Sequence, residues 1–196
     1  MNILAVDATG EVLTAAVETR GRVFAVRKSG QRPHDELLLP AVDAVLKRAR
    51  ISYNDLDAVT AAAGPGRFTG IRIGMSFAAI VGMKLNIPAF ALSRLEAVAE
   101  KSGAEDVLAA LPGWKNEVYS QRYRRLVAAD EAAWTSPEEW PRVRAEAEAK
   151  GITVSYFDTD AADLLPVARR RLKAKKFPPF APFYLKPAGY EKKPAR

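Results

Sequence analysis

The chain has 196 residues, of which 48% are hydrophobic and 27% charged, and its formal net charge is +7. This composition excludes a chain that is disordered throughout, and the length suits one domain or two small lobes. With no cysteine and one histidine, the sequence excludes disulfides, iron–sulfur clusters, thiolate catalysis and zinc sites built from cysteines or several histidines.

Membrane and export signals are not expected. No apolar run reaches the ~18–20 residues needed to cross a bilayer. The first ten residues, MNILAVDATG, lack the cationic region of a signal peptide. We therefore expect a cytoplasmic protein that does not bind membranes.

The first hundred residues alternate between short apolar runs and helical patterns. Three runs bounded by turn residues predict an antiparallel meander of strands, at 3–7, 12–18 and 22–28. Apolar residues at helical spacing predict an amphipathic helix over 33–50. Strands at 57–63 and 89–92 then alternate with helices at 70–85 and 93–102, and Ser93 and Glu96 have the spacing of a capping box.

This order, three strands followed by alternating helices and strands, predicts an α/β fold with a ribonuclease-H-like first lobe over residues 1–102. The pattern is weaker afterwards. It predicts strands at 107–111, 117–123 and 153–157 and helices at 137–150 and 160–176. We expect residues 103–196 to form a smaller second lobe that ends in a basic tail.

Asp7 ends the first strand and precedes a tight turn, where actin-like ATPases place a carboxylate for a metal-bound nucleotide. The second half of such a site would be a glycine-rich phosphate loop in the other lobe, and Leu111-Pro112-Gly113 is the nearest match. His34 begins a helix and is followed by two acids, which predicts a polar cap rather than chemistry. Asp7 alone does not make an enzyme.

The segment Gly64-Pro65-Gly66-Arg67-Phe68-Thr69-Gly70 joins a strand to a helix. It lacks the Gly-Lys-Ser/Thr end of a Walker loop, the later acid of a Rossmann turn and a glycine of the kinase loop. Two interpretations remain: a rigid turn for close packing, which we favour, or an anion site at the helix start. The candidate anion or nucleotide residues are Asp7, Gly64, Gly66, Arg67, Thr69 and Arg72.

Small residues form a stripe along the helix that follows, because Gly70, Gly74, Ala78 and Gly82 recur every four positions. Interior glycines weaken a helix by ~1 kcal/mol each, so a close contact must compensate. We favour a partner helix over the chain's own helix 33–50, and expect Ile73 and Ile80 to face the sheet. The predicted interface residues are Leu38, Val42, Val45, Gly70, Ile71, Gly74, Met75, Ala78 and Gly82.

Positive charge is concentrated near the C-terminus, where residues 167–196 contain ten Lys or Arg and a single acid, Glu191. This charge predicts either an RNA partner or a solvated helix with a basic end. Aromatic residues alternate with prolines over 177–184, and we favour rings packed back on the body over rings stacked on bases. The candidate RNA contacts are Arg169, Arg170, Arg171, Lys173, Lys175 and Lys176.

Five segments resemble the TsaB (YeaZ) family of tRNA threonylcarbamoyladenosine biosynthesis. They are ILAVDAT at 3–9, HDELLLP at 34–40, DAVTAAAGPGRFTGIRIG at 57–74, Glu117-Val118-Tyr119 and Pro182-Phe183-Tyr184-Leu185-Lys186. Residues 1–100 carry most of the resemblance, and the GPGxFTGxRIG element is its most specific part. Arg67 replaces the family's usual serine, and Leu111-Pro112-Gly113-Trp114-Lys115-Asn116 replaces a turn that contains Asp-Ala-Arg.

The resemblance implies an actin-like ATPase fold of two ribonuclease-H-like lobes with a reduced second lobe. It also implies a non-catalytic subunit, without a metal or a required cofactor, that binds a TsaD-type threonylcarbamoyltransferase through helices 34–49 and 70–85. In this family the partner modifies adenosine 37 of tRNA, a TsaE-type ATPase joins the complex, and the subunit alone forms a homodimer. Weak binding of ATP or ADP with magnesium is compatible with the resemblance.

Two other functions stay open at this point. One is an actin-like ATPase that uses Asp7 and the 64–70 loop, and the other is an RNA-binding module that depends on the basic tail. The resemblance makes the accessory subunit the leading hypothesis.

Overall fold

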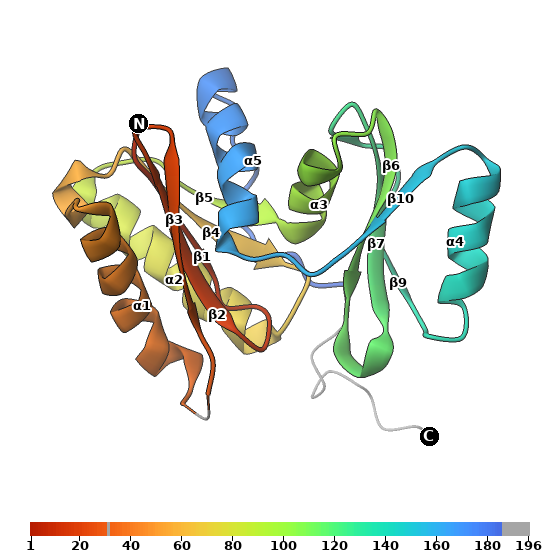
Figure 1. The fold of residues 1–196 in the computed structure, drawn as a ribbon, viewed down its shortest axis with the longest axis horizontal. Helices are drawn as coiled ribbons and strands as arrows, with labels where there is room; N and C mark the ends of the chain where they lie inside the picture. Colours follow the sequence, from red (N-terminus) through yellow and green to blue (C-terminus); the bar gives the residue numbers. More distant parts are fainter. Residues whose placement is uncertain (31, 186–196) are drawn as a thin grey trace.

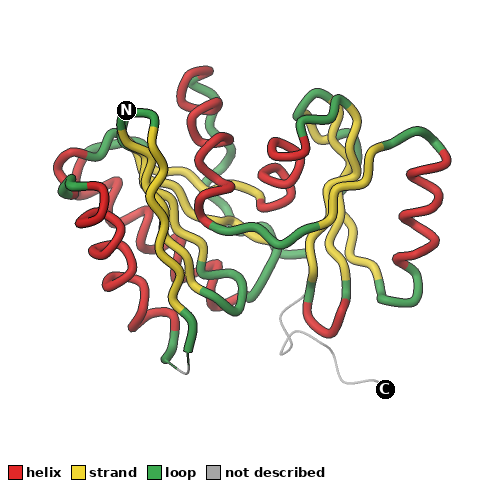
Figure 2. The backbone as a smooth tube through the Cα atoms, in the orientation of Figure 1, coloured by secondary structure: helices red, strands yellow, loops and turns green. Residues whose placement is uncertain are grey.

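The computed structural model describes residues 1–30 and 32–185, arranged as two five-stranded sheets with helices on their faces (Figure 1). The first sheet has the order β3-β2-β1-β4-β5 and the second has the order β10-β6-β7-β8, with β9 paired to β7. Figure 2 shows the two sheets as separate groups of strands with helices between and outside them.

The first sheet contains β1 (Ile3–Asp7), β2 (Leu13–Thr19), β3 (Arg22–Lys28), β4 (Ala58–Gly64) and β5 (Ala89–Ser93). The first three strands form the predicted antiparallel meander, and β4 and β5 continue the sheet in parallel with β1. Because helices cover both faces of the central strands, every residue of β1, β2 and β4 is buried.

One face of the first sheet packs on α1 (His34–Ala49) and α2 (Phe68–Leu85), and the other packs on α5 (Ala161–Ala174). By length and composition α2 could cross a membrane, which was not expected from the sequence. In the structure one side of α2 packs on β1, β4 and β5 and belongs to the larger core.

The second sheet contains β6 (Asp106–Pro112), β7 (Val118–Arg124), β8 (Val127–Ala128), β9 (Ala133–Thr135) and β10 (Thr153–Tyr156). Helix α3 (Arg94–Ser102) covers one face, and α4 (Trp140–Ala149) packs near β10 on the other. Short 3-10 turns, η1 (Tyr53–Asp55) and η2 (Trp114–Asn116), lie in the connections before β4 and β7.

Up to the end of α5 the chain crosses between the sheets twice, and this layout positions the site. After β5 it leaves the first sheet and enters α3, which packs on the second sheet; after β10 it returns as α5 to the first sheet. Helices α3 and α5 lie side by side between the sheets (Figure 1). The packing therefore does not follow the predicted division at residue 102.

Most predicted elements lie within about three residues of the observed ones, but two strands were missed and one local prediction was wrong. The short strands β8 and β9 were not predicted. The capping box at Ser93 does not form: Ser93 accepts a hydrogen bond from the Leu95 amide, whereas the Glu96 carboxylate binds Arg170 and Arg171 of α5.

The segment after α5 folds back over the first sheet, as we expected of its aromatic residues. The Phe177 ring lies 5.1 Å from that of Phe90, and the Tyr184 ring lies 4.7 Å from that of Phe68. The amide of Phe183 donates to the carbonyl of Ala63 over 2.8 Å. Lys186, Glu191 and the rest of the basic tail lie outside the described residues.

Candidate functional site

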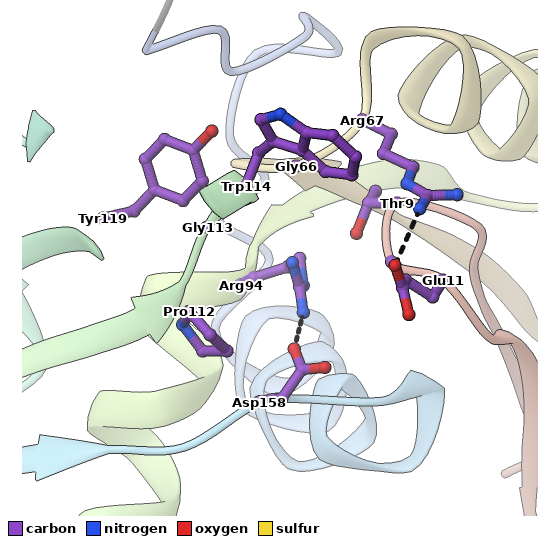
Figure 3. A pocket seen from close by; sticks show the side chains of 11 residues that line it. Thr9, Glu11, Gly66, Arg67, Arg94, Pro112, Gly113, Trp114, Tyr119 and Asp158 are labelled. Atoms are coloured by element: carbon purple, nitrogen blue, oxygen red, sulfur yellow. Dashed lines mark hydrogen bonds and ion pairs between the residues drawn. The ribbon is translucent and has the colours of Figure 1, made fainter. Parts of the chain in front are cut away.

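A cleft of about 370 Å³ lies between the two halves of the chain (Figure 3). Its walls come from the turn after β1, the glycine-rich loop after β4, the start of α3 and the turn between β6 and β7. The lining residues are Thr9, Gly10, Glu11, Gly66, Arg67, Arg94, Pro112, Gly113, Trp114, Tyr119 and Asp158.

Asp7 lies beneath this cleft, and both of its carboxylate oxygens face groups of the chain itself. Oδ1 accepts hydrogen bonds from the amide of Thr9 over 2.8 Å and from its hydroxyl over 2.6 Å. Oδ2 lies 3.2 Å from Nε of Arg94. A divalent cation at this oxygen would meet the like charge of the Arg94 guanidinium in a buried site, which opposes its binding.

Arg94 is the charged group at the floor of the cleft, and only 2% of its surface is exposed. Its Nε donates to the hydroxyl of Thr159 over 2.9 Å, and one terminal nitrogen donates to the carbonyl of Pro65 over 2.9 Å. The other terminal nitrogen pairs with the carboxylate of Asp158. The sequence alone does not single out Arg94, because its partners lie far away in the chain.

The glycine-rich loop packs against the turn after β1, which supports the interpretation as a rigid turn. A Cβ at Gly66 would lie 2.7 Å from Cβ of Thr9, and one at Gly70 would collide with the carbonyl oxygen of Ala8. The amide of Arg67 already donates to the carbonyl of Thr9 over 2.8 Å. These glycines allow close backbone approach, and that amide is not free for a phosphate.

The candidate anion residues do not gather in one place. Gly66 and Arg67 line the cleft, and Asp7 lies below it, but Gly64 packs against the backbone of Phe183. Arg72 stacks over the ring of Phe68 at 3.8 Å and donates to the hydroxyl of Tyr184, away from the cleft, and Thr69 does not line it either.

The cleft opens at a rim that carries charge and one aromatic ring. The Arg67 guanidinium pairs with Glu11 over 3.1 Å, and the Trp114 side chain from the altered 111–116 turn is 64% exposed (Figure 3). Burial, followed by the nearby Glu117 carboxylate, raises the pKa of Tyr119 and keeps its phenol neutral. The rim is therefore a mixed polar surface rather than a cationic pocket.

A second feature is a groove of about 580 Å³ between α1 and α2, which we call the α1–α2 groove. Its apolar lining includes Leu39 and Ile80, which are 56% and 65% exposed. At one side, burial and the Asp43 carboxylate raise the pKa of Tyr53 to about 12, so this phenol stays neutral at physiological pH. The lining residues are Asp35, Leu38, Leu39, Tyr53, Arg72, Ile73, Ser76, Phe77, Ile80 and Val81.

The predicted interface residues are buried inside the chain, so the predicted face of α2 was wrong. A Cβ at Gly74 would contact Ala61 and Val6, and one at Gly82 would meet Ala89, which places the small-residue stripe on the first sheet. Ile73 and Ile80, predicted to face the sheet, line the groove instead. The buried set is Leu38, Val42, Val45, Gly70, Ile71, Gly74, Met75, Ala78 and Gly82, of which Leu38 alone also lines the groove.

The candidate RNA residues divide into two groups. The three arginines fold onto acids of the chain: Arg169 pairs with Glu18, and Arg170 and Arg171 pair with Glu96. The three lysines, Lys173, Lys175 and Lys176, are exposed at the end of α5. Much of the positive charge in α5 therefore stabilises the contact between α3 and α5.

The single histidine contacts the turn after β1 and does not cap a helix. The two ring nitrogens of His34 lie 2.9 Å from the carbonyl oxygen of Ala8 and 3.2 Å from that of Glu11, and α1 has no side-chain cap. Over residues 1–30 and 32–185, no three His, Asp or Glu side chains are grouped as metal ligands would be.

Comparison with known proteins places this geometry in a family. Residues 26–139 match the family model described as TsaD, tRNA N6-adenosine threonylcarbamoyltransferase. The chain is 33% identical over 135 residues to the tRNA threonylcarbamoyladenosine biosynthesis protein TsaB of Haemophilus influenzae, and 35% identical over 129 residues to that of Escherichia coli. These matches cover 66% and 64% of this chain, but 57% and 56% of the two relatives.

The solved structure of YeaZ from Pseudomonas aeruginosa superposes with a TM-score of 0.73 at 25% identity, covering 94% of this chain and 99% of that one. The likeness therefore extends through the second sheet, where the sequence resemblance is patchy. The fold is the actin-like, ribonuclease-H-like arrangement that the sequence predicted. The chain belongs to the TsaD family, as a member of its TsaB/YeaZ branch.

Proposed function

We propose that this chain is a non-catalytic subunit that binds a TsaD-type threonylcarbamoyltransferase through the α1–α2 groove and supports modification of adenosine 37 in tRNA. The relatives named for tRNA threonylcarbamoyladenosine biosynthesis support the pathway. The matched part of this chain spans 57% of the length of the Haemophilus influenzae relative.

The observation that carries the proposal is the exposed apolar lining of the α1–α2 groove. Exposed Leu39 and Ile80 side chains lie beside partly buried Ile73 on two adjacent helices. Grouped apolar side chains on a surface cost free energy unless a partner covers them. The occupant we propose is the matching helix pair of the catalytic relative, because a chain of the same family presents helices of similar shape. A second copy fills the groove when the chain is alone.

The Asp7 site supports an accessory role. In an actin-like ATPase this carboxylate would serve a metal-bound nucleotide, but here it is neutralised by Arg94 and bound by Thr9. The glycine-rich loop packs on the turn after β1 and offers no cradle around that carboxylate.

Reconstituted tRNA threonylcarbamoylation tests the function. The reaction contains cognate TsaD-type and TsaE-type proteins, a threonylcarbamoyl-adenylate synthase, ATP, threonine, bicarbonate and tRNA, with or without this chain. We expect product only when the chain is present. Equal product without it would overturn the proposal.

Ile80→Asp tests the groove, because the side chain is 65% exposed and its replacement buries no charge in the free chain. We expect the variant to stay folded, to lose binding to the TsaD-type protein, and to remain monomeric in analytical ultracentrifugation. Val127→Asp on β8 is the matched control, since Val127 is 68% exposed and far from the groove in sequence and fold. Binding by Ile80→Asp at wild-type affinity would exclude the groove as the interface.

Contact with tRNA is a further part of the proposal, and the three exposed lysines at the end of α5 support it. Changing Lys173, Lys175 and Lys176 to Gln should reduce the slope of log affinity against log salt by about 0.9 for each phosphate that is no longer neutralised by a lysine. An unchanged slope in the assembled complex would place the tRNA elsewhere.

ATP hydrolysis by the chain alone that Asp7→Ala abolishes would instead favour the ATPase alternative.

A further inference from the structure

The two segments at which the chain crosses between its sheets meet at one side chain. The first crossing lies between Ser93 of β5 and Arg94 of α3, and the second is the 157–160 segment between β10 and α5. These crossings are backbone connections between the two halves, so any opening of the halves must change the backbone there. The other links between the sheets are side-chain contacts and the segment after α5.

Arg94 joins the crossings to each other and to the first sheet. From the start of α3 its guanidinium reaches Asp158 and Thr159 in the second crossing. The same group contacts the carbonyl of Pro65 after β4 and the carboxylate of Asp7 at the end of β1. Four segments separated in sequence thus meet at one cation. Figure 3 shows the pairing of that cation with Asp158.

Burial makes these contacts hard to exchange for water. The side chains of Arg94 and Asp7 are 3% and 4% exposed, so separating them would leave a charge unpaired in a site that water barely reaches. The contact of Arg94 with Asp7 is an ion pair, whereas its contact with Asp158 is a charge-assisted hydrogen bond, which is stronger than a neutral one. The fork of the guanidinium also fixes the angles between its partners, which a lysine would not do.

We infer that Arg94 is an internal clamp that holds the two halves of the chain closed without a ligand. Its guanidinium lines the cleft between the halves and contacts groups from both of them. The cleft keeps one width, and the relative position of the two sheets does not depend on nucleotide. This inference is independent of the proposed function.

The distance between the halves tests the clamp directly. Because the chain has no cysteine, Lys47→Cys on α1 and Lys150→Cys after α4 give two unique, exposed positions for spin labels. Double electron–electron resonance on the otherwise wild-type chain should give one narrow distance distribution that magnesium and ATP leave unchanged. Adding Arg94→Met should broaden the distribution and shift it by several ångströms.

Arg125→Met is the matched control, since that guanidinium is 82% exposed and pairs with Glu105 within the second half. We expect it to leave the distribution unchanged. A folded Arg94→Met chain with the wild-type distribution would overturn the clamp, as would a wild-type distribution that already spans open and closed distances.

Two further variants keep the test decisive if Arg94→Met does not fold. Asp158→Asn removes one partner of Arg94 and leaves the ion pair with Asp7, so it should broaden the distribution less than Arg94→Met. For Arg94→Ala, millimolar ethylguanidinium should refill the vacated site and raise Tm, whereas Arg125→Ala should not respond. No broadening in Asp158→Asn together with no rescue of Arg94→Ala would overturn the inference.

Discussion

At the scale of single residues, Asp106 shows how a carboxylate can be tied to its neighbours while it stays accessible to water. Arg122 approaches it with two nitrogens, at 2.7 and 2.6 Å, and Arg124 adds a third contact at 3.0 Å. Hydrogen bonding from Arg122 is the largest cause that lowers the pKa of Asp106, from 3.8 to about 2. The contact joins the start of β6 to the end of β7.

Because the folded pKa of Asp106 lies below its unfolded value, the charged form stabilises the fold above pH 3.8, and this contribution is lost as the pH falls toward 2. We predict that Asp106→Asn lowers Tm at pH 7 and that its difference from wild type shrinks between pH 4 and pH 2. Thermal melts followed by circular dichroism at several pH values measure this. Glu105→Gln is the control, because its partner Arg125 is 82% exposed; an equal pH dependence in both variants would contradict the assignment.

Arg94 is a site residue that local sequence patterns did not identify. Asp7 stands out by its place after a strand, and Gly66 by its motif, because both signals are local. Arg94 begins a helix like any other cation, and its partners lie 29 and 64 residues away. Only the fold brings Pro65, Asp158 and Asp7 around it.

At the scale of elements, α2 shows which features of a helix the spacing of its residues can predict and which it cannot. The stripe of small residues and the need for a close contact both follow from the sequence, but a helix that is apolar on most sides does not reveal which face meets the sheet. The choice depends on the alanines of β4, since Gly74 can approach Ala61 only where the strand is also small. Because the small-residue stripe of α2 packs on the sheet, Ile73 and Ile80 lie on another side of the helix and line the α1–α2 groove.

Two glycines of this stripe should respond oppositely to alanine. Gly70→Ala places a methyl group against the carbonyl of Ala8, and we expect it to destabilise the fold by about 3 kcal/mol. A Cβ at Gly74 would lie 3.7 Å from Ala61 and 3.8 Å from Val6, which is ordinary contact, so Gly74→Ala should stabilise by up to ~1 kcal/mol through helix propensity. Urea unfolding of both variants measures the difference. Equal effects would mean that the stripe does not pack on the sheet.

At the scale of the whole molecule, the exchange of helices makes the two halves one unit. Helix α3 follows the first sheet in sequence but packs on the second, and α5 does the reverse. Apart from β8 and β9, the sequence predicted the order of elements, and with it the fold class, because helices and strands differ in the spacing of their apolar residues. It did not predict this exchange, since a helix pattern does not say which of two sheets it will cover.

We predict a single unfolding transition for the chain. All three tryptophans, Trp114, Trp134 and Trp140, lie in the second half, so their fluorescence follows that half while far-ultraviolet circular dichroism follows both. The two midpoints in urea should coincide, because α3 and α5 pack on each other and on opposite sheets. A fluorescence transition that precedes the circular dichroism transition would show that residues 103–196 unfold separately.

The path of α5 also constrains how the chain can fold while it is being made. One face of the first sheet, which includes Ile3, Ala16 and Phe90, is covered by Leu164 and Leu165 of α5. That face stays uncovered until α5 has been synthesised. Roughly 70 residues separate β5 from α5, and a ribosome adding ~5–20 residues per second needs several seconds to supply them. During that interval an apolar sheet face is bare in the nascent chain. Substitutions in α5 should therefore reduce soluble yield in cells more than the stability of the finished protein alone would suggest.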